Sequence, residues 1–152
     1  MARLYILLLV AGAVSCAHPK GDYSGLVPAE ALRSFELPEG FQIELIASEP
    51  LVADPVAMEV DEQGNFYVVE MHGYPENLKS SGVVKLLKDT DNDGLPDASV
   101  VFADSLTLPT GIMKWKNGVI VTDVPNVWYL EDTDGDDRAE VALHDLRVIT
   151  QA

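Results

Sequence analysis

The sequence has little positive charge. Lys and Arg together number 10 against 25 Asp and Glu, which gives a formal net charge of −15 over 152 residues. A basic patch cannot be assembled from so few cations, so nucleic acid is excluded as a partner. Hydrophobic residues make up 47% of the chain, which is too many for a disordered acidic tail. These values describe a folded acidic protein about one domain in length.

Several catalytic signatures are also missing. GxSxG, HExxH, a P-loop and GxGxxG do not occur in the sequence. The chain contains one cysteine, Cys16, and no CxxCH segment, so no c-type haem is attached within these residues. A lone thiol would be unusual in an oxidising compartment unless it is modified.

The first residues, MARLYILLLVAGAVSC, are typical of a targeting segment. Arg3 precedes an apolar run over 4–14 that is too short to span a bilayer. AVSC resembles a bacterial lipobox, which implies cleavage before Cys16 and acylation of its thiol. We expect a lipoprotein signal peptide over 1–15 and a tether over 16–27. The protein would then be extracytoplasmic and lipid-anchored to a bacterial membrane, in the periplasm or at the cell surface. An ordinary cleaved secretory signal is the alternative.

The rest of the chain indicates an all-β fold. PAEALRSFELPEG predicts a short helix with Pro28 near its first turn, and the alternation in FQIELIAS predicts a lead-in strand, so residues 28–55 hold both. Beyond them, short β-rich runs are separated by turn residues at close spacing, among them Lys116–Asn117–Gly118. This pattern is typical of a mostly antiparallel sheet protein.

An internal repeat refines this prediction. LLKDTDNDGLPD at 86–97 returns as YLEDTDGDDRAE at 129–140, and the strand pairs before them repeat as well. Each unit has four strands with the acidic loop between the third and the fourth, which is the size of a β-propeller blade. We place the blades at about 56–104 and 109–146, within a blade region of 56–152.

Two blades cannot close a ring, because propellers typically have about four to eight. An open pair would expose inner strands and unpaired edges. We therefore expect a partial propeller, the N-terminal fragment of a longer protein with a larger ring. A self-standing small sandwich is the alternative.

Each acidic loop is a candidate calcium site. Acids recur at positions 1, 3, 5 and 9, and Gly94 at position 6 allows a sharp turn in the first loop. Asp137 replaces that glycine in the second loop, and we expect this to weaken the second site, because Asp adopts a left-handed backbone less readily than Gly. Calcium prefers carboxylate and carbonyl oxygens, so alternating acids on a tight loop suit it. The alternative is a pair of solvated acidic turns. The candidate ligands are Asp89, Asp91, Asp93, the Leu95 carbonyl and Asp97, and in the second loop Asp132, Asp134, Asp136 and Glu140.

A difference in loop length marks a second candidate site. Between the second and third strands the first blade carries HGYPENLKSSG, where the second has only PN. Insertions in a repeat array often collect on the binding face. We therefore take His72, with Glu70 at the strand end, as candidate catalytic residues, and Tyr74 and Glu76 as candidate ligand-binding residues. The alternative for His72 is a polar surface residue.

The order of motifs over 28–146 resembles the N-terminal propeller of the membrane-bound dehydrogenase-like proteins of planctomycetes, verrucomicrobia and relatives. The matching stretches include FELPEGFQIELIASEP, VVEMHGYPEN, GVVKLLKDTDNDGLPD, LPTGIMKW and WYLEDTDGD. These proteins are often labelled haem-binding because a cytochrome c domain with CxxCH follows the propeller. The arginine usual between Met and Gly in the family is His72 here, so no role is carried over to it.

That family is similar to soluble quinoprotein glucose and sorbosone dehydrogenases, whose propellers hold pyrroloquinoline quinone and calcium. The resemblance implies an oxidoreductase in which a quinone accepts a hydride from a sugar or alcohol while a side-chain base takes the hydroxyl proton. It also implies a cytochrome c domain in the full-length protein, and these residues alone would be inactive. The alternative function is a calcium-stiffened propeller that binds carbohydrate or a protein partner without chemistry.

Overall fold

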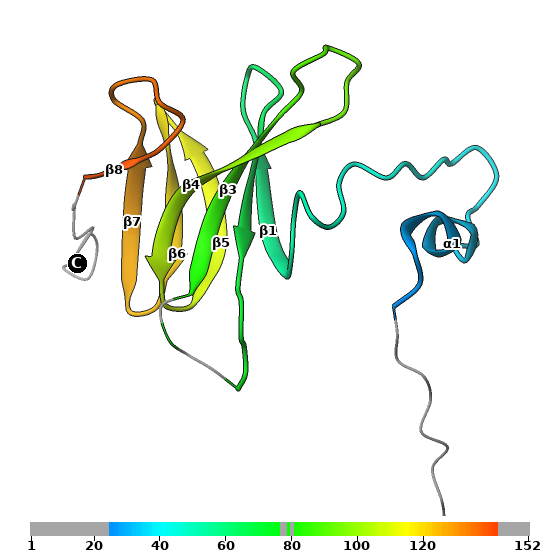
Figure 1. The fold of residues 1–152 in the computed structure, drawn as a ribbon, viewed down its shortest axis with the longest axis horizontal. Helices are drawn as coiled ribbons and strands as arrows, with labels where there is room; N and C mark the ends of the chain where they lie inside the picture. Colours follow the sequence, from blue (N-terminus) through cyan, green and yellow to red (C-terminus); the bar gives the residue numbers. More distant parts are fainter. Residues whose placement is uncertain (1–24, 77–78, 80, 143–152) are drawn as a thin grey trace, which may run out of the picture.

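The computed structural model describes residues 25–76, 79 and 81–142 (Figure 1). One short helix, α1 (Pro28–Arg33), precedes the strands, and Pro28 stands in its first turn as expected. Within the described part of the chain, no helix is long and apolar enough to cross a membrane. The strands are β1 (Pro55–Val60), β2 (Phe66–Glu70), β3 (Gly82–Lys88), β4 (Ala98–Leu106), β5 (Pro109–Trp115), β6 (Gly118–Asp123), β7 (Asn126–Glu131) and β8 (Glu140–Ala142).

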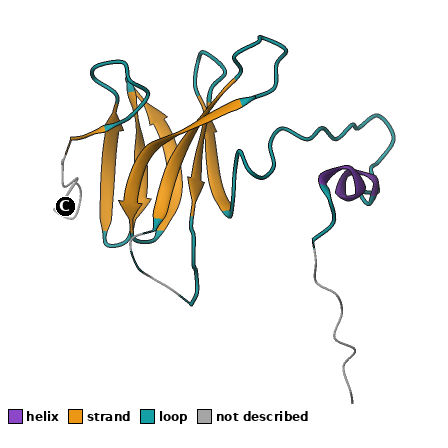
Figure 2. Ribbon diagram, viewed as in Figure 1, coloured by secondary structure: helices purple, strands orange, loops and turns teal. Residues whose placement is uncertain are grey.

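The strands form two antiparallel sheets, ordered β1-β2-β3-β4 and β5-β6-β7-β8 (Figure 2). Each sheet is a meander of four sequential strands, and the two repeats define one sheet each. The prediction of an all-β, partial propeller-like fold with two four-stranded units is therefore confirmed. The ring is not closed by the two sheets.

Local sequence explains the turns. Between β1 and β2, the Asp61 carboxylate accepts the N–H groups of Gln63 and Asn65 and the Asn65 side-chain amide, at 2.8–2.9 Å. Gly64 takes the positive φ of 86° that the turn requires. The asparagine-glycine turn between β5 and β6 also forms as expected, since Trp115 pairs with Gly118.

The lead-in strand expected within 28–55 does not form. Residues 41–48 belong to no sheet, and Phe41, Ile43 and Leu45 are 69%, 39% and 40% exposed. Alternation shows which side chains a strand would bury, but a strand also needs a neighbour for its backbone groups. No described strand pairs with this segment.

The two sheets pack face to face, and each contributes a different face to the contact. We call the face of the first sheet with Phe66, Val68 and Leu87 its front, and the face with Tyr67 and Val69 its back. By the repeat and the strand register, the second sheet has its front at Val119, Val121 and Leu130 and its back at Ile120 and Tyr129. The core joins the back of the first sheet to the front of the second, with Val69, Val84, Val119 and Val121 fully buried.

Polar contacts reinforce this interface. The Ala139 N–H donates to the Phe102 carbonyl at 2.8 Å, which links the second sheet to the outer strand of the first. The Lys88 ammonium binds both carboxylate oxygens of Asp137 at 2.8 and 2.9 Å. The two blades are therefore fixed to each other through an apolar core and through their loops.

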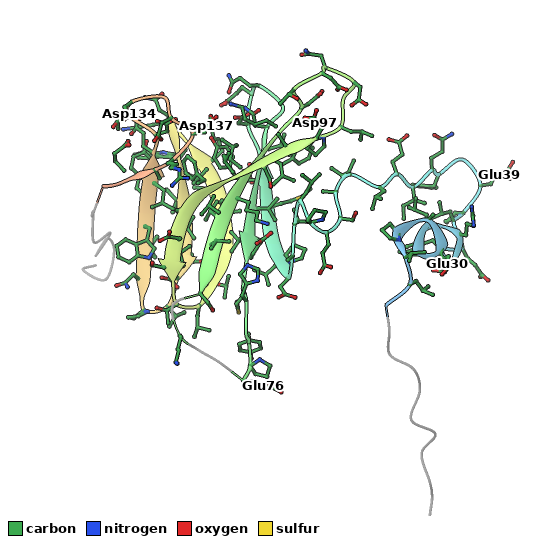
Figure 3. All side chains as sticks on the ribbon, in the orientation of Figure 1. Glu30, Glu39, Glu76, Asp97, Asp134 and Asp137 are labelled. Carbon is green, nitrogen blue, oxygen red and sulfur yellow. The ribbon has the colours of Figure 1, made fainter. Side chains whose placement is uncertain are left out.

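The two ends of the sheets carry different loops (Figure 1). The β3–β4 and β7–β8 loops, which are the acidic ones, lie at one end. The long β2–β3 loop, the β6–β7 turn and the β4–β5 connection lie at the other. Figure 3 accordingly shows Asp97 and Asp134 at the upper end and Glu76 at the lower tip. The two candidate sites cannot share a ligand.

Candidate functional site

The first acidic loop brings three of its acids together. One oxygen from each of Asp89, Asp91 and Asp93 lies within 4.8 Å of the others. The Asp89 carboxylate accepts the N–H groups of Asp93 and Gly94 at 3.2 and 2.8 Å, which curls the backbone around it. Gly94 adopts a φ of 94° that a side chain would disfavour. Asn92 also has a positive φ, 61°, which asparagine tolerates better than most residues.

The other two candidate ligands of this loop have different partners. Asp97 accepts the N–H and the hydroxyl of Thr90 at 2.7–2.9 Å, which closes the base of the loop. Asp97 does not belong to the cluster of three. Leu95 donates its N–H to Asp93 at 2.8 Å.

The second loop brings four acids together. One oxygen from each of Asp132, Asp134, Asp136 and Glu140 lies within 4.8 Å of the others. Glu140 also accepts the N–H and hydroxyl of Thr133, both at 2.6 Å, and so repeats the contact that Asp97 makes in the first loop. The fourth acid therefore closes the loop and joins the cluster at the same time.

Asp137, which replaces the glycine of the first loop, is accommodated. It takes a φ of 67°, and its N–H donates to Asp132 at 2.9 Å. Its side chain is held by Lys88 of the other sheet. The ion pair holds the Asp137 carboxylate in place. The turn therefore forms with aspartate at the position where the first loop has glycine.

Hydrogen bonds lower the pKa of three loop carboxyls. The donors are the Gly135 N–H above all for Asp132, the Thr90 hydroxyl for Asp97 and the Thr133 hydroxyl for Glu140. Folding therefore favours their ionised forms, and this contribution to stability is present above the usual carboxyl pKa and lost as the pH falls through the lowered values. All three are ready to act as anionic ligands at neutral pH.

Asp91 behaves differently from these three. The Asp93 N–H lowers its pKa, but the charge of Asp93, desolvation, the contact with Asp89 and the charge of Asp97 together raise the pKa of Asp91 above its usual value. Repulsion among the acids of the first loop is therefore not fully relieved by the protein's own donors. A bound cation would relieve it.

The opposite end carries a buried carboxylate with three polar contacts. Glu70 is fully buried at the end of β2. Its Oε1 accepts the Ala53 N–H at 2.7 Å and lies 3.2 Å from the Lys85 ammonium. Its Oε2 lies 2.9 Å from His72 Nε2. Lys85 in turn donates to the Leu51 carbonyl at 3.0 Å.

His72 connects this buried group to the surface. Its side chain is 34% exposed, and its second nitrogen, Nδ1, lies 3.3 Å from the Asp54 carboxylate, which is 67% exposed. The structure thus brings His72 and Glu70 together, with Nε2 held firmly and Nδ1 in a longer contact near water. Tyr74 is 64% exposed and Glu76 lies at the loop tip (Figure 3). Among the described residues, no hydrogen bond or ion pair joins Tyr74 or Glu76 to His72 or Glu70.

Sequence reasoning missed the equivalent carboxylate of the second sheet. Asp123 is 2% exposed at the end of β6, and its Oδ1 accepts the N–H groups of Thr107 and Leu108 at 2.8 and 2.6 Å. Its Oδ2 accepts the Trp128 indole N–H at 3.0 Å. The repeat carried a signal for this role, since both second strands end in an acid, VVE and VTD.

Glu70 and Asp123 share a structural task. Each lies opposite a proline that opens the first strand, Pro55 and Pro109 respectively. Each accepts backbone N–H groups from the segment that leads into that strand. We call these two residues the strand-end carboxylates. Cys16 and residues 143–146 of the expected second blade lie outside the described residues.

A family model described as a domain of unknown function, DUF7133, matches residues 27–144. The match covers α1, the segment over residues 34–54 that connects α1 to β1, and both sheets. Neither a curated protein nor a solved structure matches the chain.

Proposed function

We propose, for a chain that belongs to the DUF7133 family of domains of unknown function, that the two sheets are calcium-binding blades of an extracytoplasmic β-propeller. The observation that carries the proposal is the second acidic loop, where one oxygen from each of four acids lies within 4.8 Å of the others. All four are hard oxygen donors, and calcium takes about six to eight such ligands. The donor chemistry therefore fits the ion.

The ion would stiffen the end of each blade. Like charges a few ångströms apart in partly screened surroundings repel by about 1–4 kcal/mol per pair. A divalent cation reverses this repulsion and ties β3 to β4, or β7 to β8, across the loop. Because Lys88 precedes the first loop and binds Asp137 in the second, order in one loop also supports the other. The proposed role is that of a rigid scaffold for a binding or reacting surface.

Calcium titration tests this role. We expect binding heat by calorimetry with an affinity in the range of extracellular modules, about 10⁻⁴–10⁻³ M. Calcium at ten times Kd should raise the free energy of unfolding by about 1.4 kcal/mol per site, from RT ln(1 + [Ca]/Kd). The melting temperature should therefore rise with calcium and fall back when a chelator is added.

Single substitutions assign the sites. Asp91→Ala leaves two acids of the first cluster and should abolish that site, whereas Asp134→Ala leaves three acids in the second and should weaken it. Asp104→Ala is the matched control, since it removes an exposed acid outside both loops. If the unsubstituted protein shows neither binding heat nor a rise in melting temperature with calcium, both loops are solvated acidic turns.

The location is part of the proposal. The segment before Cys16 and the lipobox-like AVSC support export and acylation at the membrane surface. We expect the full chain to incorporate labelled palmitate in a bacterial host and to partition into detergent, and Cys16→Ala to do neither. Equal labelling of the two forms would contradict the lipid anchor.

A second candidate function is a sugar or alcohol dehydrogenase, which the geometry of His72 favours. Glu70 holds Nε2 at 2.9 Å, whereas the partner of Nδ1 among the described residues is the exposed Asp54 carboxylate at 3.3 Å. A substrate hydroxyl could replace Asp54 there and pass its proton to the ring, with Glu70 fixing the orientation of the ring. Tyr74 and Glu76 lie on the same loop and could contact the substrate. The hydride on the alcohol carbon would need a two-electron acceptor held elsewhere in the full-length protein, from which a cytochrome c domain could take the electrons.

The described residues do not fit pyrroloquinoline quinone on their own. That cofactor is a tricarboxylate and needs cationic partners. Lys85, the cation beside Glu70, is 17% exposed and already bound, and the exposed groups near it include Asp54. We therefore assign no quinone ligand to these residues and derive no step through the cofactor.

Turnover in the full-length protein tests the second candidate. Sugars and alcohols should reduce an artificial electron acceptor when quinone and calcium are supplied. His72→Gln should lower kcat by about 10²–10⁴-fold, the usual contribution of a general base, with little change in melting temperature. Asp104→Ala, which removes an exposed acid away from this loop, is the control for surface charge. Equal kcat for His72→Gln and the unsubstituted protein would remove His72 from the reaction.

A further inference from the structure

The chain that leads into β1 is built like the connection between the two sheets. In that connection the Thr107 N–H, two residues before β5, donates to the strand-end carboxylate of the second sheet at 2.8 Å. The Ala53 N–H, two residues before β1, donates to the strand-end carboxylate of the first sheet at 2.7 Å. The same contact therefore holds both connections, at the same number of residues from the strand that follows.

The residue before each of these donors is apolar and buried. Leu106 is 4% exposed and shares a core cluster with Val121 on the front of the second sheet. Val52 is 9% exposed and shares a cluster with Val68 on the front of the first sheet. Val68 and Val121 occupy equivalent positions, two residues before the strand-end carboxylate of their sheet. Residues 49–54, which we call the entry link, thus make the contacts of a link between two sheets.

The connection between the two sheets shows which element precedes such a link. It is β4, the outermost strand of the first sheet, and the back of that sheet covers the front of the second. Residues 41–48 precede the entry link, so by the same order they correspond to the outermost strand of a sheet that covers the front of the first. The Leu51 N–H donates to the Ser48 carbonyl at 2.9 Å, and this turn would end the strand earlier than β4 ends.

Residues 41–48 have the alternation of a strand but belong to neither described sheet. Phe41, Ile43, Leu45 and Ala47 share one side by alternation. The first three are 69%, 39% and 40% exposed, whereas Ala47 packs against the buried cluster on the front of the first sheet. In Figure 1 the segment leads away from β1 toward α1, beyond both sheets. Its apolar side and its backbone therefore face outward from the front of the first sheet without a neighbouring strand.

The front of the first sheet has room for a further sheet. Met58 and Val60 lie on this face and are 59% and 42% exposed. A cavity of about 340 Å³ lies beside Met58, between the face and the connecting segment. The equivalent face of the second sheet is covered, and Val119 and Val121 on it are fully buried. The covering sheet must therefore present an apolar back, as the first sheet does to the second.

We propose that residues 41–48 are the outermost strand of the sheet that closes the ring, and that later residues of the full-length chain supply its other three strands. The inference rests on the proposed function, in which the two sheets are blades of a propeller. The partner is then a strand edge with unpaired N–H and C=O groups, on a sheet with an apolar back. Pairing satisfies the backbone of the segment and removes the free edge. It joins the first blade to the last by hydrogen bonds between distant parts of one chain.

Hydrogen exchange in the full-length protein tests the pairing. An outermost strand pairs on one side only, so the N–H groups of every second residue in 41–48 should exchange slowly and those between them fast. Residues 35–37, which belong to no described element, are the reference. The slow amides of 41–48 should exchange at least about tenfold more slowly than the amides of this reference. The slow exchange should not depend on protein concentration, because the partner strand belongs to the same chain.

Two substitutions that add the same charge on opposite sides of the segment extend the test. Ile43→Asp places an acid on the side of Ala47, toward the first sheet, whereas Gln42→Asp replaces an exposed polar residue on the other side. In the full-length protein we expect Ile43→Asp to abolish the slow exchange and to lower the melting temperature. Gln42→Asp should leave both close to those of the unsubstituted protein. Circular dichroism verifies that both variants keep their β-sheet content.

Three results would overturn the inference. They are fast exchange throughout 41–48 in the unsubstituted protein, slow exchange that appears only at high concentration, since a second copy would then supply the neighbouring strand, and equal melting temperatures for the two variants. Failure of the calcium role is a separate outcome, because calcium titration of the same protein reports on the acidic loops. Slow exchange of alternate amides without a calcium response would support the closing strand and remove the calcium role.

Discussion

Replacing Asp123 by alanine is expected to lower the free energy of unfolding by about 3–5 kcal/mol, because three buried N–H donors lose their charged acceptor. The carboxylate is 2% exposed and accepts three N–H groups, from Thr107, Leu108 and the Trp128 indole. Alanine leaves all three donors without this acceptor in a buried site, and each unsatisfied donor costs about 1–3 kcal/mol. A domain of this size has only about 5–15 kcal/mol in total.

Urea unfolding followed by tryptophan fluorescence measures this effect, since Trp128 contacts the carboxylate directly. Asp123→Asn keeps one oxygen for Thr107 and Leu108 but places an amide against the indole N–H, so its loss should be intermediate. Asp104→Ala, an exposed acid of β4, should change the midpoint little. An Asp123→Ala midpoint as close to the unsubstituted value as that of Asp104→Ala would contradict the role of a strand-end carboxylate.

The sequence allowed the sheets to be predicted because their signals are local. The acidic repeat fixed the spacing of the blades, and alternation along FYVVE separated Val68 from Val69 on opposite faces of one strand. The prediction of a lead-in strand was wrong for a non-local reason. Alternation in 41–48 shows what a strand there would bury, but it carries no information on whether a neighbouring strand is present.

In the candidate sites too, local features could be predicted from the sequence and non-local ones could not. Clustering of Asp89, Asp91 and Asp93 follows from their own spacing, so it could be predicted. The effect of Asp137 could not, because its partner Lys88 comes from the other sheet. A positive φ was expected to weaken that loop, yet the ion pair between blades holds the residue in place. Comparing the sequence of one repeat with that of the other does not reveal which residues of the two repeats contact each other.

The strand-end carboxylates lie between these two cases. Their position at the end of VVE and VTD is visible in the sequence, but their function depends on register. Because Glu70 pairs with Pro55 and Asp123 with Pro109, each acid reaches the backbone just before the first strand of its own sheet. An acid placed one residue earlier would point to the opposite face. Sequence reasoning therefore proposed Glu70 as a candidate catalytic residue but did not foresee that it binds the chain leading into β1.

Replacing Glu70 by alanine is expected to lower the free energy of unfolding by about 3–5 kcal/mol, because a buried ion pair loses one partner. Lys85, 17% exposed, would keep its charge without the carboxylate 3.2 Å away, and the Ala53 N–H would lose its acceptor. Removing Lys85 as well should recover part of the loss. A double-mutant cycle of Glu70→Ala and Lys85→Ala in urea should give an interaction energy within about 0.5–3 kcal/mol, and a value near zero would contradict the pair.

A comparison of the Glu70→Ala and His72→Gln variants separates a structural role of His72 from a chemical one. If Glu70 acts on the fold through Lys85 and Ala53, then His72→Gln should cost far less stability than Glu70→Ala, since His72 is 34% exposed and has a surface partner in Asp54. Any loss of turnover in His72→Gln would then be chemical, whereas a loss in Glu70→Ala would reflect the displaced strand. A melting temperature that falls equally in both variants would instead make His72 part of the scaffold, and the second candidate function would lose its proton-transfer residue.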